Sequence, residues 1–434
     1  MTHRSIMICV LPLLSAACGD DMTSAGIGDK STGLEYLESK LLPPPLQPGE
    51  LDTLDIECAL ENQVASKTHR PAAEVDYSRP GWETRIASDW QFFDAPSNLG
   101  WLTAIDFRRQ DDGLAYRYLA NDASHDRLYE PWSSSKIQAF TAAVSVLRQQ
   151  GIGADASVGG VAMADLITSI NSYAPSGNAD DSSNAIASFL LNVAGRDYAT
   201  SLFHDAWLKL ANDRVRFRGA YGPTAFKPAS YEFVSAGGTE RYEPGAYTAS
   251  GDDPGYLDYL CESCGTDGNK AMTALAQTEW LKRLASHSRE PATRHPDLET
   301  SDVETLFFGG RERSSGDVGG MLAGISVFLP EALARALAPG TERDAKRTLD
   351  ALTGGRWRVY QKVGWGPSET RGTSELVILA HVCLPEIGGS GREFTLFARA
   401  AVPGADPDKS GVGNACRKLS ELLDRSLPQL LDAR

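Results

Sequence analysis

The sequence predicts an α+β fold, in which an antiparallel sheet assembled from both ends of the chain is flanked by helices and carries an inserted all-helical subdomain. Three observations lead to this prediction. An alternating strand pair comes first, a mostly helical stretch with polar insertions continues to about residue 350, and β-rich segments followed by one amphipathic helix come last.

The first strands are predicted from strict alternation. Residues 102–107 and 114–119 alternate between apolar and polar side chains, and Asp-Asp-Gly at 111–113 marks the turn between them. Residues 136–149 then have apolar side chains at helical period, and Gly151 ends that helix. A hairpin therefore leads into a buried helix.

The later elements follow the same two periods. We expect helices at 185–193, 271–284 and 329–337, strands at 356–362, 374–384 and 393–402, and a final helix at about 414–431.

Composition narrows the function. The formal net charge of -15 argues against a nucleic-acid partner, because phosphate binding needs clustered Lys and Arg. The seven His residues are scattered, without two at ligand spacing on one helix, so we expect no metal and no organic cofactor. We expect a monomer that acts on a small molecule.

The N-terminus resembles an export signal. A short basic start, residues 1–4, precedes an apolar run at 6–14 and small residues at 15–17, a stretch too short to span a bilayer. Cys18 after small residues resembles a lipobox, although Ser15 stands where lipoproteins usually have Leu. We expect a periplasmic lipoprotein held to the membrane by lipid on Cys18, with plain secretion as the alternative.

These patterns divide the chain into three parts. We assign residues 1–17 to the signal peptide, 18–80 to a flexible tether and N-terminal segment, and 85–434 to the folded domain, with its helical subdomain at about 137–350.

Five cysteines remain after Cys9 and Cys18, which permits two disulfides and leaves one thiol unpaired. Cys261 and Cys264 form a Cys-x-x-Cys without a second pair or nearby His that would complete a zinc set. We expect a structural disulfide there, and the sequence does not determine the remaining pairing.

The candidate chemistry begins at Ser133 and Lys136, a Ser-x-x-Lys directly before the helical run. A serine hydroxyl needs a base within hydrogen-bond reach, and residues at i and i+3 of a first helical turn share a face. A serine that merely caps a helix is the alternative. Two further segments follow in order, Ser-Ser-Asn at 182–184 and Lys-Val-Gly at 362–364.

With these motifs the sequence resembles the serine β-lactamase and penicillin-binding D,D-peptidase superfamily, and it is most similar to class A β-lactamases. The segments 182–191 and 362–372 carry the resemblance, including Arg371 nine positions after Lys362, and it extends over roughly residues 85–434. It implies a β-lactamase/transpeptidase-like fold.

The resemblance implies acylation of Ser133, with Lys136 as the base and Ser182 passing a proton to the leaving nitrogen. Ser-x-Asn also occurs at 169–171 and 176–178, but only the copy at Ser182 precedes a Leu-rich helix.

It also implies the substrate contacts. Asn184 would hold the substrate's amide side chain, and Lys362 would supply positive charge toward a carboxylate. Trp365, after Gly364, would donate its N–H to the developing oxyanion together with the N–H of Ser133. Val363 lacks the hydroxyl expected there, so Arg371 would compensate with a bidentate grip. Lys-Ser-Gly at 409–411 fits the motif better but lies in a loop without a preceding strand.

The resemblance places the deacylating base in an Arg-x-Glu-Pro loop closed by Asn. Glu243 lies in Arg-Tyr-Glu-Pro at 241–244, but Tyr247 stands at the Asn position and the spacing requires an insertion. Three functions therefore remain open. The first is a β-lactamase that deacylates through Glu243 or a substitute, and the second is a D,D-carboxypeptidase acting on peptidoglycan peptides. The third is a binding homologue that keeps the fold with weak turnover.

Overall fold

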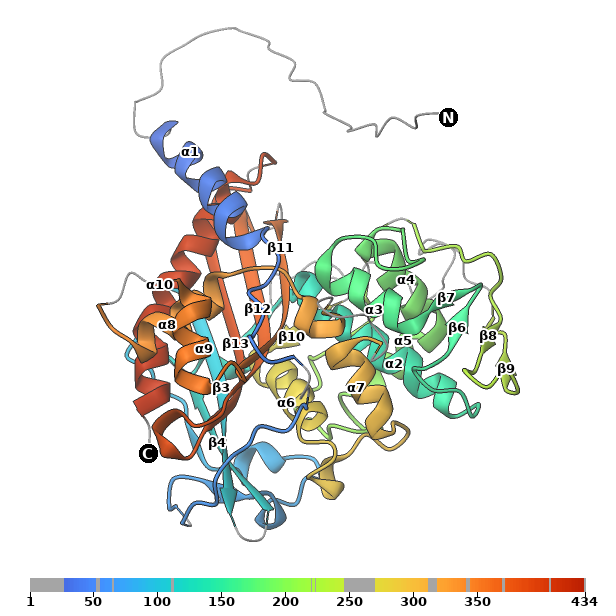
Figure 1. Cartoon of the computed structure of the whole chain (residues 1–434), viewed down its shortest axis with the longest axis horizontal. Coiled ribbons are helices and arrows are strands. Elements are labelled where there is room, and N and C mark those ends of the chain that lie inside the picture. Colours follow the sequence, from blue (N-terminus) through green and yellow to red (C-terminus); the bar gives the residue numbers. More distant parts are fainter. Residues whose placement is uncertain are drawn as a thin grey trace, which may run out of the picture.

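The computed structural model describes residues 27–51, 55–64, 66–110, 113–219, 221–222, 224–245, 270–310, 318–340, 344–368, 371–405 and 407–432. It confirms the α+β prediction: a central antiparallel sheet lies between a layer of helices and a larger, mostly helical part (Figure 1).

The central sheet has strands from both ends of the chain, in the order β1-β4-β3-β13-β12-β11, with β2 beside β4. Strand β13 pairs antiparallel with β3, for example Phe394 with Asp106, and so joins the two ends. The bounds are β1 Arg70–Pro71, β2 Ser88–Asp89, β3 Trp101–Gln110, β4 Gly113–Ala120, β11 Arg358–Ser368, β12 Thr373–Leu384 and β13 Arg392–Pro403.

The two faces of this sheet bury different clusters. Leu376 and Ile378 of β12 pack in the cluster under α10, whereas Val377 and Leu379 pack in the cluster on the opposite face. Successive strand side chains point to opposite faces, and both faces are covered here, so β12 is a nearly continuous apolar run.

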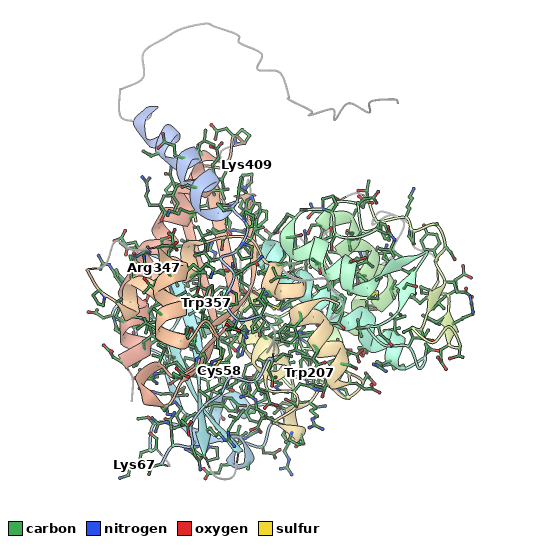
Figure 2. The ribbon with its side chains drawn as sticks, viewed as in Figure 1. Cys58, Lys67, Trp207, Arg347, Trp357 and Lys409 are labelled. Atoms are coloured by element: carbon green, nitrogen blue, oxygen red, sulfur yellow. A yellow bond between two sulfur atoms is a disulfide. The ribbon has the colours of Figure 1, made fainter. Side chains whose placement is uncertain are left out.

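Helices α8 Phe328–Leu337, α9 Ala345–Thr353 and α10 Ser410–Asp432 cover one face (Figure 1). Trp357, labelled in Figure 2, is fully buried, and its Nε1 donates to Asp350 Oδ1 of α9 at 2.8 Å.

The N-terminal segment differs from the expected flexible tether. Helix α1, Ile27–Tyr36, packs on α10, and the π-helical turn η1, Leu37–Leu41, buries both of its leucines. Cys58, labelled in Figure 2, forms a disulfide with Cys383 of β12. The Pro-rich composition predicted flexibility, but isolated apolar residues such as Ile56 are enough to anchor the described part of this segment.

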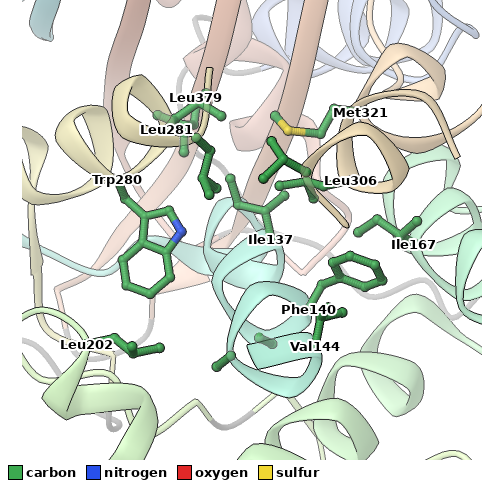
Figure 3. Close-up of a cluster of buried hydrophobic side chains, with 14 of the residues drawn as sticks. Ile137, Phe140, Val144, Ile167, Leu202, Trp280, Leu281, Leu306, Met321 and Leu379 are labelled. Carbon is green, nitrogen blue, oxygen red and sulfur yellow. The ribbon is translucent and has the colours of Figure 1, made fainter. Parts of the chain in front are cut away.

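The other face carries helices α2 to α7, whose bounds are α2 Lys136–Arg148, α3 Met163–Ser172, α4 Ser183–Ala194, α5 Arg196–Ser201, α6 Ala274–Ala285 and α7 Thr300–Phe308. Helix α2 is central: Figure 3 shows its residues Ile137, Phe140 and Val144 among apolar side chains of the neighbouring helices. Truncating such a side chain to Ala typically costs about 2–5 kcal/mol, so α2 holds its first turn in a rigid setting.

This part also contains short strands that the sequence did not predict, because two-residue strands have no detectable period. A four-stranded sheet, β7-β6-β8-β9, lies at its outer end (Figure 1), and β5 pairs with β10. The bounds are β5 Leu128–Tyr129, β6 Ser157–Val158, β7 Val161–Ala162, β8 Phe233–Val234, β9 Arg241–Tyr242 and β10 Met272–Thr273. Within the described ranges, no helix has the length and hydropathy needed to cross a membrane.

Short 3₁₀ turns connect these elements: η2 Ala72–Glu74, η3 Trp82–Thr84, η4 Ser124–Asp126, η5 Trp132–Ser135, η7 Pro291–Thr293, η8 Gly320–Ala323 and η9 Ile387–Gly389.

Candidate active site

Ser133 lies in the turn η5, immediately before α2, and its side chain is half-buried. The preceding residue, Trp132, has a left-handed backbone with φ of +50°. A non-glycine residue in this region costs about 1–3 kcal/mol and persists only where its surroundings impose it. Here the indole Nε1 of Trp132 donates to Glu375 Oε2 at 3.1 Å, which holds the turn in place.

Strand β11 approaches this turn at Gly364. A Cβ atom at position 364 would come within 2.5 Å of the Ser133 backbone N and 2.9 Å of the Pro131 carbonyl oxygen, so only glycine fits. The close approach places the next residue, half-buried Trp365, beside the turn. An oxyanion pocket formed by the N–H groups of Ser133 and Trp365 stays a prediction that agrees with this arrangement.

Lys136 is fully buried at the start of α2. Its Nζ donates to Ser183 Oγ at 2.9 Å and to Asn184 Oδ1 at 2.6 Å. Burial lowers the pKa of Lys136 well below its usual range, and the charge of Lys270 lowers it further. A neutral amine has two N–H groups, which these two acceptors satisfy, and its lone pair is left to accept a proton.

Of the two neighbouring serines, Ser183 and not Ser182 reaches Lys136. Ser182, the predicted proton relay, is exposed and caps α4, accepting a hydrogen bond from the Ala185 N–H at 3.2 Å. Ser183 is the buried one, and its Oγ donates to the Ile170 carbonyl at 3.0 Å while accepting from Lys136. The N-cap position turns Ser182 outward, so the hydroxyl that reaches Lys136 is one residue later.

Tyr173 is a further candidate residue, which the sequence did not predict. It follows α3 with φ of +55°, its hydroxyl donates to the Val363 carbonyl at 2.8 Å, and it lies near the Ser133 side chain. Because the Val363 carbonyl accepts the one phenolic O–H, a hydrogen bond between the two hydroxyls would have Ser133 as its donor. Burial raises the pKa of Tyr173, and the Ser133 side chain opposes that rise. No sequence motif distinguishes this Tyr from others that end helices.

Lys362 of β11 lies beside Tyr173. Its Nζ is 3.7 Å from the centre of the Tyr173 ring and donates to the Ile170 carbonyl at 2.6 Å. Burial, and then the charge of Lys136, lower the pKa of Lys362 well below its usual range. Val363 faces the opposite side of β11 and packs in the cluster under α10. The position where the motif expects a hydroxyl is therefore a core position in this protein. Lys409, of the competing motif, is exposed in the turn before α10 and lies near α1 (Figure 2).

Arg371 is already held by carboxylates. Its Nε pairs with Glu375 Oε1 at 2.8 Å, and its Nη2 lies 3.2 Å from Glu130 Oε2. Burial acts to raise the pKa of Glu375, but Arg399 and Arg371 overcome it and hold this pKa at about 2. The predicted bidentate grip of Arg371 on a substrate carboxylate is therefore in competition with two protein carboxylates.

Glu243, the predicted deacylating base, lies far from Ser133. It is exposed and directly follows β9, which pairs with β8 at the outer end of the helical part, whereas Ser133 lies against β11 (Figure 1). The Arg-x-Glu-Pro segment forms the end of a short hairpin strand and does not line the site around Ser133. Tyr247 and the cysteines Cys9, Cys18, Cys261 and Cys264 lie outside the described residues.

A third lysine, Lys270, lies near Lys136 and was also missed. It is buried just before β10, its Nζ is 3.6 Å from Glu130 Oε1, and it lies over the ring of Tyr221. The Tyr221 hydroxyl in turn bonds Ser135 Oγ at 2.9 Å. Its sequence neighbours gave no signal, because the pairing of β5 with β10 brings it to the site.

Asn184 is exposed on the first turn of α4, and its Oδ1 accepts the hydrogen bond from Lys136. Among the residues that the structure describes, no group of three His, Cys, Asp or Glu side chains could hold a metal ion.

No family model and no curated protein matches the sequence. Among solved structures, the TLA-3 extended-spectrum β-lactamase is similar over 76% of this chain and 95% of its own, at 9% identity and a TM-score of 0.41. A class A β-lactamase of the last common ancestor of Gram-negative bacteria matches at 13% identity over 75% and 91%, with a TM-score of 0.37. The chromosome-encoded β-lactamase of Vibrio parahaemolyticus matches at 10% identity over 76% and 92%, with a TM-score of 0.36. At TM-scores below 0.5, these similarities support no conclusion about activity.

Proposed function

We propose that this chain is an exported active-site-serine hydrolase that opens β-lactams through an acyl-enzyme on Ser133. One observation carries the proposal: Ser133 lies beside Tyr173, whose ring is shared by two buried lysines, Lys136 at 5.4 Å and Lys362 at 3.7 Å. A hydroxyl beside two amines of lowered pKa is the setting in which serine becomes a nucleophile at neutral pH.

Acylation would use these groups in order. Lys136, as the neutral amine, accepts the proton of the Ser133 hydroxyl directly or through Tyr173 as Oγ attacks the carbonyl carbon. The oxyanion is bound by the N–H groups of Ser133 and Trp365. When the C–N bond breaks, the proton returns through Tyr173 to the leaving nitrogen, so Tyr173 takes the relay role that the sequence motif assigned to Ser182.

Two residues would orient the substrate. Lys362, over the ring of Tyr173, would suit a substrate carboxylate when it is protonated, and the exposed amide of Asn184 suits the amide side chain of an acylated substrate. We give Arg371 the role of neutralising Glu130 and Glu375 behind the site, in place of direct substrate binding.

The second candidate is a D,D-carboxypeptidase acting on peptidoglycan peptides, for which β-lactams are slow inhibitors. The position of Glu243 on the outer hairpin favours it, because rapid hydrolysis of the acyl-enzyme needs a base at Ser133. The two candidates share the acylation step and differ in the fate of the acyl-enzyme.

A time course of intact mass separates them. Soluble protein lacking residues 1–26 is mixed with excess benzylpenicillin. A transient adduct that disappears as penicilloate accumulates indicates a β-lactamase, and a stable adduct with little product indicates the peptidase. Ser133→Ala is the control, and an adduct of unchanged mass and yield on that variant would reject Ser133 as the nucleophile.

We further propose that the protein is a monomeric periplasmic lipoprotein, with Cys18 as the lipidated residue. Incorporation of a radiolabelled fatty acid that is lost in Cys18→Ser would support it. Unchanged incorporation in that variant, or a soluble full-length periplasmic protein, would contradict the lipid anchor.

A further inference from the structure

Three lysines meet around two tyrosine rings at this site, but their partners differ. Lys136 donates to the neutral oxygens of Ser183 and Asn184, and Lys362 donates to a backbone carbonyl. In the described part of the chain, Lys270 is the one of the three with an ion pair to a carboxylate, Glu130, at 3.6 Å.

Lys136 and Lys270 lie on the same ring. The Nζ atoms of Lys136 and Lys270 are 5.4 Å and 4.9 Å from the centre of the Tyr221 ring. Both distances are measured to one point, so the two amines are at most about 10 Å apart, within reach of a strong Coulomb interaction in a protein interior. Both side chains are buried, so water screens this interaction little.

The carboxylate decides which amine carries the charge. Two buried ammonium groups this close repel each other, so one of them is more stable as the neutral amine. Glu130 stabilises the charge on Lys270, and its second oxygen is held by Arg371 at 3.2 Å. No carboxylate of the described residues does the same for Lys136.

We propose that Lys270 is a positioning residue that keeps Lys136 in its neutral, proton-accepting form, with Glu130 holding Lys270 as the cation of the pair. The inference rests on the proposed function, because only a nucleophilic Ser133 needs a neutral Lys136. The direction of the pKa shifts agrees: burial and then Lys270 lower the pKa of Lys136, whereas Glu130 opposes the effect of burial on Lys270.

Other groups also face Lys136, and their effects on the pKa of Lys136 must stay constant in a test. They come from every element packed around it: Lys362 of β11, Tyr173 after α3, Tyr221, and the neutral Ser183 and Asn184 of α4.

The test reads the Lys136 titration directly. Protein labelled with ¹³C at lysine is titrated by NMR, and the Lys136 signal is assigned with Lys136→Arg. At a separation of about 10 Å and an effective dielectric constant of about 20, removing the Lys270 charge should raise the pKa of Lys136 by about one unit. We expect that rise in Lys270→Met, little change in Lys270→Arg, and a smaller rise in Glu130→Gln because Lys270 then loses its proton more easily.

The proposal is overturned if the Lys136 titration is the same in Lys270→Met as in the wild type, or if Lys270→Arg shifts it as far as Lys270→Met. Should Lys270→Met fail to fold, Glu130→Gln decides, and an unshifted Lys136 titration there rejects the proposal.

The kinetic readout is separate from the titration. On the acidic limb of the pH profile, the rate of labelling by a fluorescent penicillin should be about tenfold lower in Lys270→Met than in the wild type, because less Lys136 is neutral there. At high pH the two rates should become equal. Labelling absent from the wild type would reject the proposed function, while the NMR titration still decides the role of Lys270.

Discussion

Glu375 links the stability of the fold to the geometry at Ser133. Its carboxylate is fully buried, and Arg399 Nη2 and Arg371 Nε each lie 2.8 Å from Oε1, while the Trp132 indole donates to Oε2. Replacing it by Gln leaves two guanidinium groups with less compensating charge, which typically costs about 3–5 kcal/mol for a buried pair.

The pH dependence gives a second, independent value for the stability that the Glu375 carboxylate contributes. The pKa of this carboxyl falls from 4.5 to about 2 on folding, which corresponds to about 3 kcal/mol of stability. Because the folded pKa is the lower one, this stability is present above pH 4.5 and is lost as the pH falls toward 2. At pH 3 about 2 kcal/mol of it is gone.

Urea unfolding of the wild type and Glu375→Gln at pH 7 and pH 3 measures both the cost of the substitution and its pH dependence. The difference in free energy of unfolding between the two proteins should narrow by about 2 kcal/mol between pH 7 and pH 3. Glu421→Gln removes an exposed pair with Arg425 and serves as the control, with an effect below about 1 kcal/mol. An equal difference at both pH values would refute the assignment of Glu375 as an ionised buried anchor.

Three further predictions concern Ser133. Tyr173→Phe removes the phenol hydroxyl near Ser133 and should slow acylation by penicillin about 10²–10⁴-fold with the fold intact by circular dichroism, and an unchanged rate would exclude Tyr173 as the proton relay. Ser183→Ala should slow acylation and cost about 1–3 kcal/mol of stability, whereas Ser182→Ala should cost only about 1 kcal/mol of stability; equal labelling rates in the two variants would contradict the assignment of Ser183 as the partner of Lys136. Gly364→Ala should slow acylation at least about 10²-fold, since its Cβ would press on the Ser133 N–H, and wild-type kinetics would disprove that contact.

Local patterns predicted the elements well. The β-rich run at 374–384 is strand β12, Thr373–Leu384, and the helical period at 136–149 is α2, Lys136–Arg148. Burial on one face or both imposes these periods on the sequence, so they can be seen without the structure. Two-residue strands, and the packing of the described residues between 27 and 80, leave no such period and were not predicted.

The same division holds at the candidate site. Ser133 and Lys136 are one helical turn apart, and Lys362 and Gly364 lie on one strand, so each pair was visible in the sequence. Ser182 and Glu243 matched local motifs, yet the structure turns Ser182 to solvent and places Glu243 on the outer hairpin.

The sequence pattern by itself therefore predicts a serine and a lysine on one face at the start of a buried helix, next to a sheet built from both chain ends. Which groups complete that pair was decided by packing: Tyr173 from the end of α3, Ser183 from α4, and Lys270 with Glu130 from the β5–β10 pairing. The physical reason is that hydrogen bonds and Coulomb interactions depend on distance in space, and segments far apart in the sequence acquire those distances only when the core between them has packed.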